Sequence, residues 1–255
     1  MMGRPELSII VLTCNQSGFT MRLLQSMLPY LREKGERVEL IVVDNGSADG
    51  TAAAIEAFRT GNSLRNLRLL RSEENLGVAR GRNLGLASAG GEVLMLLDND
   101  TIADGETYDA LLRHVAATPG CGIAAPALYS PGGELQASAK PYPGLWLKVA
   151  HLLRPGRELE CEREELRKPH PFYVIGACQV FRREVYEKVG PLDAAIFYGP
   201  EDADFCIRVR KAGYTVDYLS DLRLTHDWQR ATRRSPFSRL GRLHAKALLH
   251  FWLKH

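Results

Sequence analysis

Two acidic motifs carry residue types that could do chemistry, and the spacing of the first suits a divalent metal ion. Asp98 and Asp100 follow the apolar run 93–97 with one residue between them, so both carboxylates should project from the end of a strand. Mg²⁺ or Mn²⁺ prefers such oxygen ligands and keeps open positions for phosphate oxygens. The pair could equally be two solvated turn residues, because Asp favours turns and a D-x-D match is frequent by chance.

The second motif, Glu201-Asp202-Ala203-Asp204, stands at the start of a helix expected over 203–211. Acids at a helix start ordinarily interact with the helix dipole or cap the first turn. Gly176 upstream and the tight segment 198–200 immediately before the motif could instead aim one of these carboxylates into a cleft.

Asp44 and His226 are further candidates for a ligand site. Asp44 closes an expected strand and could accept a hydrogen bond from a base N–H or a ribose hydroxyl. It could also belong to a plain strand-to-helix turn, in which Ser47 or Asp49 caps the helix. His226 follows a strand-like run and could bind a metal through a ring nitrogen, although a lone histidine is more often a packing or surface residue.

The segments that must position these residues alternate between strands and helices. Short apolar runs are each followed by a segment with helical spacing. The pairs are 7–12 with 19–31, 38–43 with 52–58, 67–70 with 78–89, and 93–97 with 108–117. Continuous apolar strands between helices predict a mostly parallel sheet covered on both faces, with ligands at the carboxyl ends of its strands.

The second half of the chain is less regular. Residues 129–171 contain many prolines and glycines without a clean period, which predicts a substrate-facing insertion with a mobile part. Regular structure is expected again over 172–180 and 203–211, followed by strands at 214–219 and 222–224.

Composition limits the class of protein. The chain has 255 residues, 45% of them hydrophobic and 25% charged, which fits one large globular domain or two small ones. A net charge of +3 gives no indication of a nucleic-acid partner. The five cysteines are odd in number and form no CxxC pair, which favours reduced thiols in the cytoplasm. No apolar run approaches the length of a membrane span.

The residues after Asp227 include no acid, and their arginines and lysines alternate with large apolar side chains. A basic helix of this kind is usually a solvated face or a packing element. It could also rest on an anionic membrane surface.

Taken in order, five segments of the chain form a pattern that is far more specific than any one motif. They are Ser8 to Thr13, Leu40 to Ser47, Glu74 to Gly77 with Arg82-Asn83, Leu96 to Asp100, and Glu201 to Asp204. Together they closely resemble the family 2 inverting glycosyltransferases with a GT-A fold. Within that family they look most like the bacterial rhamnosyltransferase-like branch that builds cell-surface polysaccharide.

The resemblance covers roughly residues 7–226 and implies a Rossmann-like, nucleotide-binding α/β sandwich with a mostly parallel central sheet. It implies a GT-A domain over 1–227, with a nucleotide-sugar half at about 1–128 and an acceptor half at about 129–227. A basic amphipathic segment, 228–255, would follow.

The resemblance also implies how the first half binds the donor. Thr13 and Asp44 would hold the nucleoside, with Asn15 and Arg82 nearby. Asp98 would contact the ribose and the metal region.

The metal and the base follow from the same resemblance. Asp100, with Asp98, would bind Mg²⁺ or Mn²⁺ under the diphosphate, and His226 matches a histidine that often completes that site. Asp202 matches the usual catalytic base, with Glu201 beside it as the second candidate.

Two other positions concern specificity. The segment Gly176-Ala177-Cys178 would line the acceptor side. Cys14 stands where many relatives carry a tyrosine or another residue that stacks near the base, which leaves the nucleobase open.

These roles predict an inverting transfer from a UDP-, dTDP- or GDP-sugar to a hydroxyl of a glycan or lipid-linked acceptor. The carboxylate would take the hydroxyl proton while the metal stabilises the departing diphosphate, with no covalent enzyme intermediate. We expect a cytoplasmic protein with peripheral contact at the cytoplasmic face of the inner membrane, and no nucleic-acid partner.

Two alternatives remain open. A nucleotidyltransferase would release pyrophosphate, but the first strand is followed by no glycine-rich, lysine-bearing loop. The second alternative is a catalytically silent module that only binds a nucleotide sugar. Such a module would not need Asp98, Asp100 and Asp202, which the chain retains.

Overall fold

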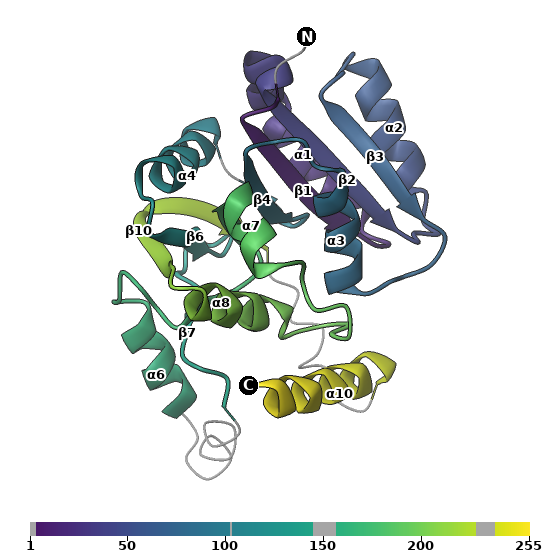
Figure 1. The fold of residues 1–255 in the computed structure, drawn as a ribbon. Helices are drawn as coiled ribbons and strands as arrows, with labels where there is room; N and C mark the ends of the chain where they lie inside the picture. Colours follow the sequence, from purple (N-terminus) through teal and green to yellow (C-terminus); the bar gives the residue numbers. More distant parts are fainter. Residues whose placement is uncertain (1–3, 103, 145–156, 228–237) are drawn as a thin grey trace.

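A mixed sheet of eight strands forms the centre of the fold (Figure 1). The computed structural model describes residues 4–102, 104–144, 157–227 and 238–255. The helices are α1 (Ser17–Lys34), α2 (Thr51–Gly61), α3 (Val78–Ser88), α4 (Gly105–Ala117), α6 (Arg157–Glu165), α7 (Arg183–Val189), α8 (Glu201–Lys211) and α10 (Arg239–Lys254), with a 3₁₀ turn at Gly35–Arg37. The strands are β1 (Leu7–Thr13), β2 (Val38–Asn45), β3 (Leu67–Ser72), β4 (Val93–Asp98), β5 (Thr101–Ile102), β6 (Cys121–Tyr129), β7 (Ala139–Lys140), β8 (Tyr173–Val174), β9 (Cys178–Arg182) and β10 (Thr215–His226).

The sheet is mostly parallel, as the sequence predicted. Its order is β3-β2-β1-β4-β9-β6-β10-β5. The first four strands in this order pair in parallel, β9 runs against both β4 and β6, and β10 is parallel to β6. Strands β1, β2, β4, β6 and β10 therefore point the same way and present their carboxyl ends at one edge. The small strands β7 and β8 form a separate ribbon.

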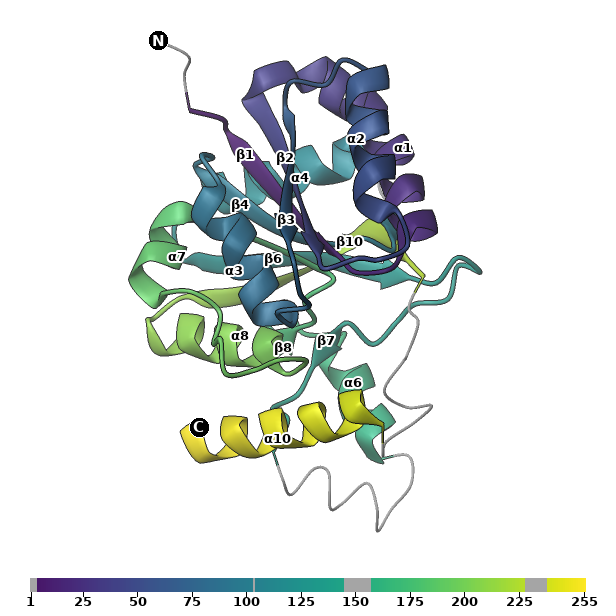
Figure 2. The same ribbon diagram turned by 90° about the vertical axis from the view of Figure 1, so that its right-hand side faces the viewer.

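Helices cover both faces of the sheet (Figure 2). Helices α1, α2 and α4 lie on one face, and α3, α7 and α8 lie on the other. Along β2 the side chains alternate between the two hydrophobic cores, with Leu40 and Val42 in one and Ile41 and Val43 in the other. This alternation is the reason that the run is apolar throughout, because a strand covered on both faces has no solvent side.

The second half differs from the prediction in detail. The expected strand 172–180 is divided into β8 and β9 by a turn at Gly176 and Ala177. The two expected strands 214–219 and 222–224 are one strand, β10, whose pairing with β6 shifts between Leu219 and Arg223. Helix α7 was not among the helices predicted from the sequence.

The start of α2 also differs. Its N-cap is Gly50 in a left-handed conformation, so neither Ser47 nor Asp49 occupies the capping position. Asp49 still accepts a hydrogen bond from the backbone N–H of Thr51 in the first turn, 3.1 Å away.

The C-terminal helix α10 packs against the part of the fold that carries α8. Phe251 is fully buried, and the indole N–H of Trp252 donates to the carbonyl of Pro143. The buried carboxylate of Asp204 pairs with Lys254 at 2.6 Å and with His255 at 2.8 Å. The segment is therefore a packing element along its described part, while Arg230, Arg233 and Arg234 lie outside the described residues. No helix among the described residues is long and apolar enough to cross a membrane.

Candidate functional site

The carboxyl edge of the sheet brings the two halves of the chain together at one point. Strand β4 is buried along its apolar residues and emerges at Asp98. Strand β5 then pairs with the end of β10, so that Thr101 lies opposite His226. The backbone N–H of Asp227 also donates to the carbonyl of Asp100, at 2.9 Å. This pairing carries His226 to the acids that follow β4.

Asp98, Asp100 and His226 form one cluster, with all three candidate ligand atoms within 4.8 Å of one another. The amide of Gln136 orients the histidine: its Nε2 donates to the carbonyl of His226 at 2.7 Å, which turns its Oε1 toward Nδ1 at 2.8 Å. Nδ1 must therefore carry a hydrogen, and Nε2 is the ring nitrogen that faces Asp100, at 3.4 Å from Oδ1. An outer hydrogen bond of this kind is typical of a metal-binding histidine.

The cluster fits a divalent cation. Asp100 Oδ1 is buried, and apart from His226 Nε2 at 3.4 Å it has no polar partner among the described residues, although buried polar atoms normally form a hydrogen bond. Burial by itself would lower the pKa of His226, but the neighbouring carboxylates Asp100, Asp98 and Asp227 raise it. Without a cation, the carboxylates therefore favour the protonated, positively charged form of the imidazole. Carboxylate and imidazole ligands with positions left open to solvent suit Mg²⁺ or Mn²⁺ with phosphate oxygens.

Arg82 connects this cluster to the second acidic motif. It lies on α3, buried to 3% exposure, and its Nη2 donates to Asp98 Oδ1 at 2.5 Å and to the carbonyl of Gly176 at 2.8 Å. Its Nη1 lies 3.5 Å from Glu201 Oε1. A buried guanidinium is tolerated only when it is paired in this way. Arg82 therefore serves as a structural bridge between the sheet edge and the start of α8.

Glu201 and Asp202 are the first two residues of α8, and their surroundings differ. Asp202 is half-buried and accepts hydrogen bonds from the N–H groups of Gly176 at 3.1 Å and Ala203 at 2.7 Å. Burial raises the pKa of Asp202, and the two backbone donors oppose the rise. Burial and the charge of Asp202 raise the pKa of Glu201 to about 7, while Arg82 opposes them. Asp202 is thus the more accessible and the better oriented carboxylate.

The predicted nucleoside-binding residues surround the ends of β1 and β2. Thr13 is buried, and its hydroxyl already bonds to Thr20 and Asn99, so its side chain holds β1 against α1 and the loop after β4. Asn15 has a φ of 53° and accepts from the N–H of Ala48 at 2.8 Å, which fastens the loops after β1 and β2 together. Both residues support the edge, and a direct contact with a nucleoside stays a prediction.

Asp44 lies buried near the carboxyl end of β2, at the same edge of the sheet. Only 1% of its surface is exposed, and its Oδ1 accepts from the N–H of Ser47 at 3.3 Å. Its Oδ2 lies 4.0 Å from Nε of Arg71, an exposed residue of β3 that sequence reasoning had not selected. Cys14 is half-buried beside it, and burial with the charges of Asp44 and Asp49 raises the pKa of its thiol.

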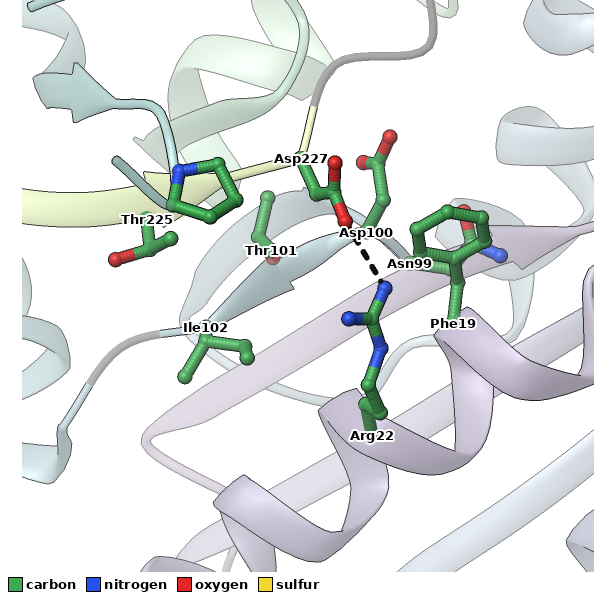
Figure 3. A pocket seen from close by; sticks show the side chains of 9 residues that line it. Phe19, Arg22, Asn99, Asp100, Thr101, Ile102, Thr225 and Asp227 are labelled. Atoms are coloured by element: carbon green, nitrogen blue, oxygen red, sulfur yellow. Dashed lines mark hydrogen bonds and ion pairs between the residues drawn. The ribbon is translucent and has the colours of Figure 1, made fainter. Parts of the chain in front are cut away.

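A cavity of about 80 Å³ opens beside Asp100 (Figure 3). Phe19 and Arg22 of α1 line one wall, and Thr225 and Asp227 line another. Arg22 reaches across to Asp227, 3.1 Å away. A typical ligand pocket has a volume of about 300 Å³ or more, so this cavity is far smaller than one. A ligand of nucleotide size would not fit inside this cavity.

Gln136 and Arg22 are the contributors that sequence reasoning missed. Gln136 lies in the region without periodicity, 90 residues from the histidine it orients. Arg22 lies 205 residues from Asp227. No local pattern could have found either one, because each matters only through a contact that the folded chain creates.

Comparison with known protein families identifies what the chain resembles. The model of the family described as glycosyl transferase family 2 matches residues 8–190. A protein of Sinorhizobium fredii, "Uncharacterized protein y4gI", is 32% identical over 84% of this chain, which spans only 23% of that relative. The N-acetylglucosaminyl-diphospho-decaprenol L-rhamnosyltransferase of Mycobacterium tuberculosis is 28% identical over 91% of this chain and 80% of its own length.

Solved structures with the same fold include the mannosyltransferase PcManGT of Pyrobaculum calidifontis in complex with GDP-Man and Mn²⁺. The TM-score is 0.65 at 20% identity, over 98% of this chain and 71% of that one. At this identity the likeness concerns the fold alone.

Gln136→Leu should weaken metal binding without removing a ligand, because the ring of His226 loses the group that orients it. We expect the affinity for Mn²⁺, measured by electron paramagnetic resonance with a nucleoside diphosphate present, to fall about 10- to 100-fold. Gln25→Leu, on the exposed side of α1, is the matched control and should bind as the wild type does. Unchanged affinity in Gln136→Leu would contradict the role of the amide.

Glu201→Gln should change how stability depends on pH. The folded state holds the Glu201 proton up to about pH 7, whereas the unfolded chain releases it near 4.5. Ionisation of Glu201 therefore favours the unfolded chain. As the pH rises from 4.5 to about 7 and above, the free energy of unfolding of the wild type should fall relative to that of Glu201→Gln, by up to about 3 kcal/mol. Urea unfolding at pH 4.5 and pH 8 measures the difference, with exposed Glu187→Gln as control. An equal difference at both pH values would refute the raised pKa.

Proposed function

The chain belongs to glycosyl transferase family 2, and we propose that it is a metal-dependent, inverting enzyme that moves a sugar from a nucleoside diphosphate donor to an acceptor hydroxyl. The predicted family, with its rhamnosyltransferase-like branch, and the predicted GT-A fold are confirmed. The observation that carries the proposal is that the Asp98, Asp100 and His226 cluster is joined through Arg82 to the carboxylates at the start of α8.

Asp100, Asp98 and His226 would hold Mg²⁺ or Mn²⁺, which supplies positive charge for the diphosphate that leaves. The edge needs this charge, because the three acids Asp98, Asp100 and Asp227 are each paired with one basic group there, which leaves no surplus positive charge for a diphosphate. A doubly charged diphosphate would otherwise meet acids of the same sign. Arg82 neutralises part of the Asp98 charge and fixes the direction of its second oxygen.

Asp202 is the proposed base. Its raised pKa makes it a better proton acceptor than an ordinary aspartate, and the N–H groups of Gly176 and Ala203 fix its orientation. It would take the proton of the acceptor hydroxyl as that oxygen bonds to the anomeric carbon and the bond to the diphosphate breaks. Attack from the face opposite the leaving group inverts the anomeric centre. Glu201 remains the second candidate, but it is buried against Arg82.

The donor and the acceptor are further parts of the proposal. PcManGT was solved with GDP-Man and Mn²⁺, and the mycobacterial relative is named for L-rhamnosyl transfer to a lipid-linked sugar diphosphate. We propose a UDP-, dTDP- or GDP-sugar donor, bound at Asp44 and the loops after β1 and β2, and a lipid-linked glycan acceptor for cell-surface polysaccharide. The first 128 residues would form the donor half and residues 129–227 the acceptor half, with the protein in the cytoplasm.

Nucleoside diphosphate release should separate this function from its rivals. UDP-, dTDP- and GDP-sugars are tested in turn, each with Mn²⁺ or Mg²⁺. The wild type should release nucleoside diphosphate from its own donor, and removal of the metal with a chelator should stop the release. Asp202→Asn should bind the donor but transfer about 10² to 10⁴ times more slowly, because it lacks a base. Asp100→Ala should lose metal-dependent turnover, and exposed Asp221→Asn should behave as the wild type does.

Two outcomes of that experiment would refute the proposal. Release of pyrophosphate from a nucleoside triphosphate and a sugar phosphate would indicate a nucleotidyltransferase. Tight donor binding without turnover, even with lipid-linked acceptors, would indicate a silent binding module.

Helix α10 is the proposed contact with the membrane. Arg242, Lys246, Leu249 and Leu253 are exposed and recur at helical spacing, so they share one face of α10. Leu249 and Leu253 are 57% and 82% exposed, while Phe251 faces inward. Two cations and two leucines on one face suit an anionic lipid surface, where apolar burial adds to charge attraction.

The double substitution Leu249→Glu with Leu253→Glu should abolish sedimentation with vesicles that contain anionic lipid, because it removes the apolar contact and adds negative charge. Leu135→Glu changes an exposed leucine outside α10, at 50% exposure, and this variant should sediment normally. Sedimentation that persists in the double variant would exclude α10 as the contact.

A further inference from the structure

A second cluster of metal-binding side chains lies at the opposite edge of the sheet from the donor site. His114 is in the last turn of α4, Cys121 is the first residue of β6, and Asp217 is near the start of β10. Asp217 pairs with Ala124 and Thr225 with Tyr129, five positions along β6. At about 3.3 Å per residue, the cluster is roughly 17 Å or more from His226, too far to share its ion.

The three side chains converge on one point. Their ligand atoms, a ring nitrogen, a sulfur and a carboxylate oxygen, all lie within 4.8 Å of one another. His114 Nε2 is 2.8 Å from Asp217 Oδ2. Around a tetrahedral Zn²⁺ with bonds of about 2.0 to 2.3 Å, such atoms lie roughly 3.3 to 3.6 Å apart. Small side-chain shifts would therefore accommodate the ion.

The other oxygen of the carboxylate is held separately. Asp217 Oδ1 accepts from the hydroxyl of Thr215 at 2.6 Å and lies 2.9 Å from His170 Nδ1. These contacts fix the plane of the carboxylate and leave Oδ2 turned toward His114. Metal-binding carboxylates are commonly supported by such outer hydrogen bonds.

The site is buried on one side and open on the other. Cys121 and Asp217 are buried, whereas the side chains of His114 and His170 are 28% and 53% exposed. An ion could therefore enter from the histidine side and keep a water as its fourth ligand. Cysteine, histidine and aspartate together favour Zn²⁺ over Mg²⁺, which avoids thiolates.

We propose that His114, Cys121 and Asp217 form a zinc site, with His170 and Thr215 holding the second oxygen of Asp217. The ion takes the place of the proton between His114 Nε2 and Asp217 Oδ2. The imidazole keeps one proton, on Nδ1, and the displaced protons, including that of the Cys121 thiol, pass to solvent as nitrogen, oxygen and sulfur bind zinc. The three bonds would join α4, β6 and β10. The site is independent of the proposed transfer reaction.

Sulfur binds zinc as the thiolate, so the metal must displace the proton of the Cys121 thiol. Binding should therefore tighten as the pH rises. Without an ion, the same groups remain a hydrogen-bonded network around Asp217.

Cobalt is the probe that tests the proposal, because Co²⁺ bound to a thiolate has a charge-transfer band in the near ultraviolet. The full chain is freed of metal with a chelator and titrated with Co²⁺. We expect one equivalent to produce the thiolate band and Zn²⁺ to remove it. Asp100→Ala should retain the band, which separates this site from the donor site.

The substitutions Cys121→Ser and His114→Gln should abolish the band or weaken cobalt binding at least tenfold. His114→Gln changes a partly exposed side chain and keeps a hydrogen-bonding group next to Asp217, so it serves if Cys121→Ser folds poorly. Zn²⁺ should also raise the melting temperature of the wild type and of Asp100→Ala, but not that of His114→Gln. Absence of a thiolate band in the wild type, or its persistence in Cys121→Ser, would overturn the proposal.

Discussion

The buried charge of Arg82 is the constraint on which the rest of the site depends. A guanidinium with 3% exposure must be paired, and its partners come from three separate places: Asp98 at the end of β4, the carbonyl of Gly176, and Glu201 at the start of α8. Removing one partner would leave an uncompensated charge, which is costly in a protein interior. The Asp98, Asp100 and His226 cluster and the start of α8 are therefore held at a fixed separation by one side chain.

The carboxyl edge of the sheet shows that residues chosen from a local motif come together only through long-range strand pairing. Asp98 and Asp100 come from one strand end, but the antiparallel pairing of β5 with β10 supplies His226 from 126 residues further along the chain than Asp100. Gln136, from the irregular insertion, then fixes which ring nitrogen faces the acids. Three segments distant in sequence thus determine the geometry around one point.

The sequence was sufficient for the alternating elements of the first half, because strands covered on both faces are apolar throughout and helices between them keep their period. It also indicated Asp98, Asp100 and His226, which the fold brings together, and Asp202 at the start of α8; their roles stay predictions. It could not provide the division of 172–180 at Gly176, the shifted pairing of β10, or the role of Gln136. These depend on contacts between distant residues, and such contacts leave no local periodicity to detect.

Gly176 connects two chemical functions although it has no side chain. Its carbonyl accepts from Arg82 and its N–H donates to Asp202, while a Cβ at this position would lie 2.5 Å from Arg82 Nη1. The peptide groups on either side of one Cα thus link the buried cation to the proposed base. Any side chain at this position would push the Arg82 guanidinium aside, so one substitution would disturb the Arg82 and Asp202 contacts together.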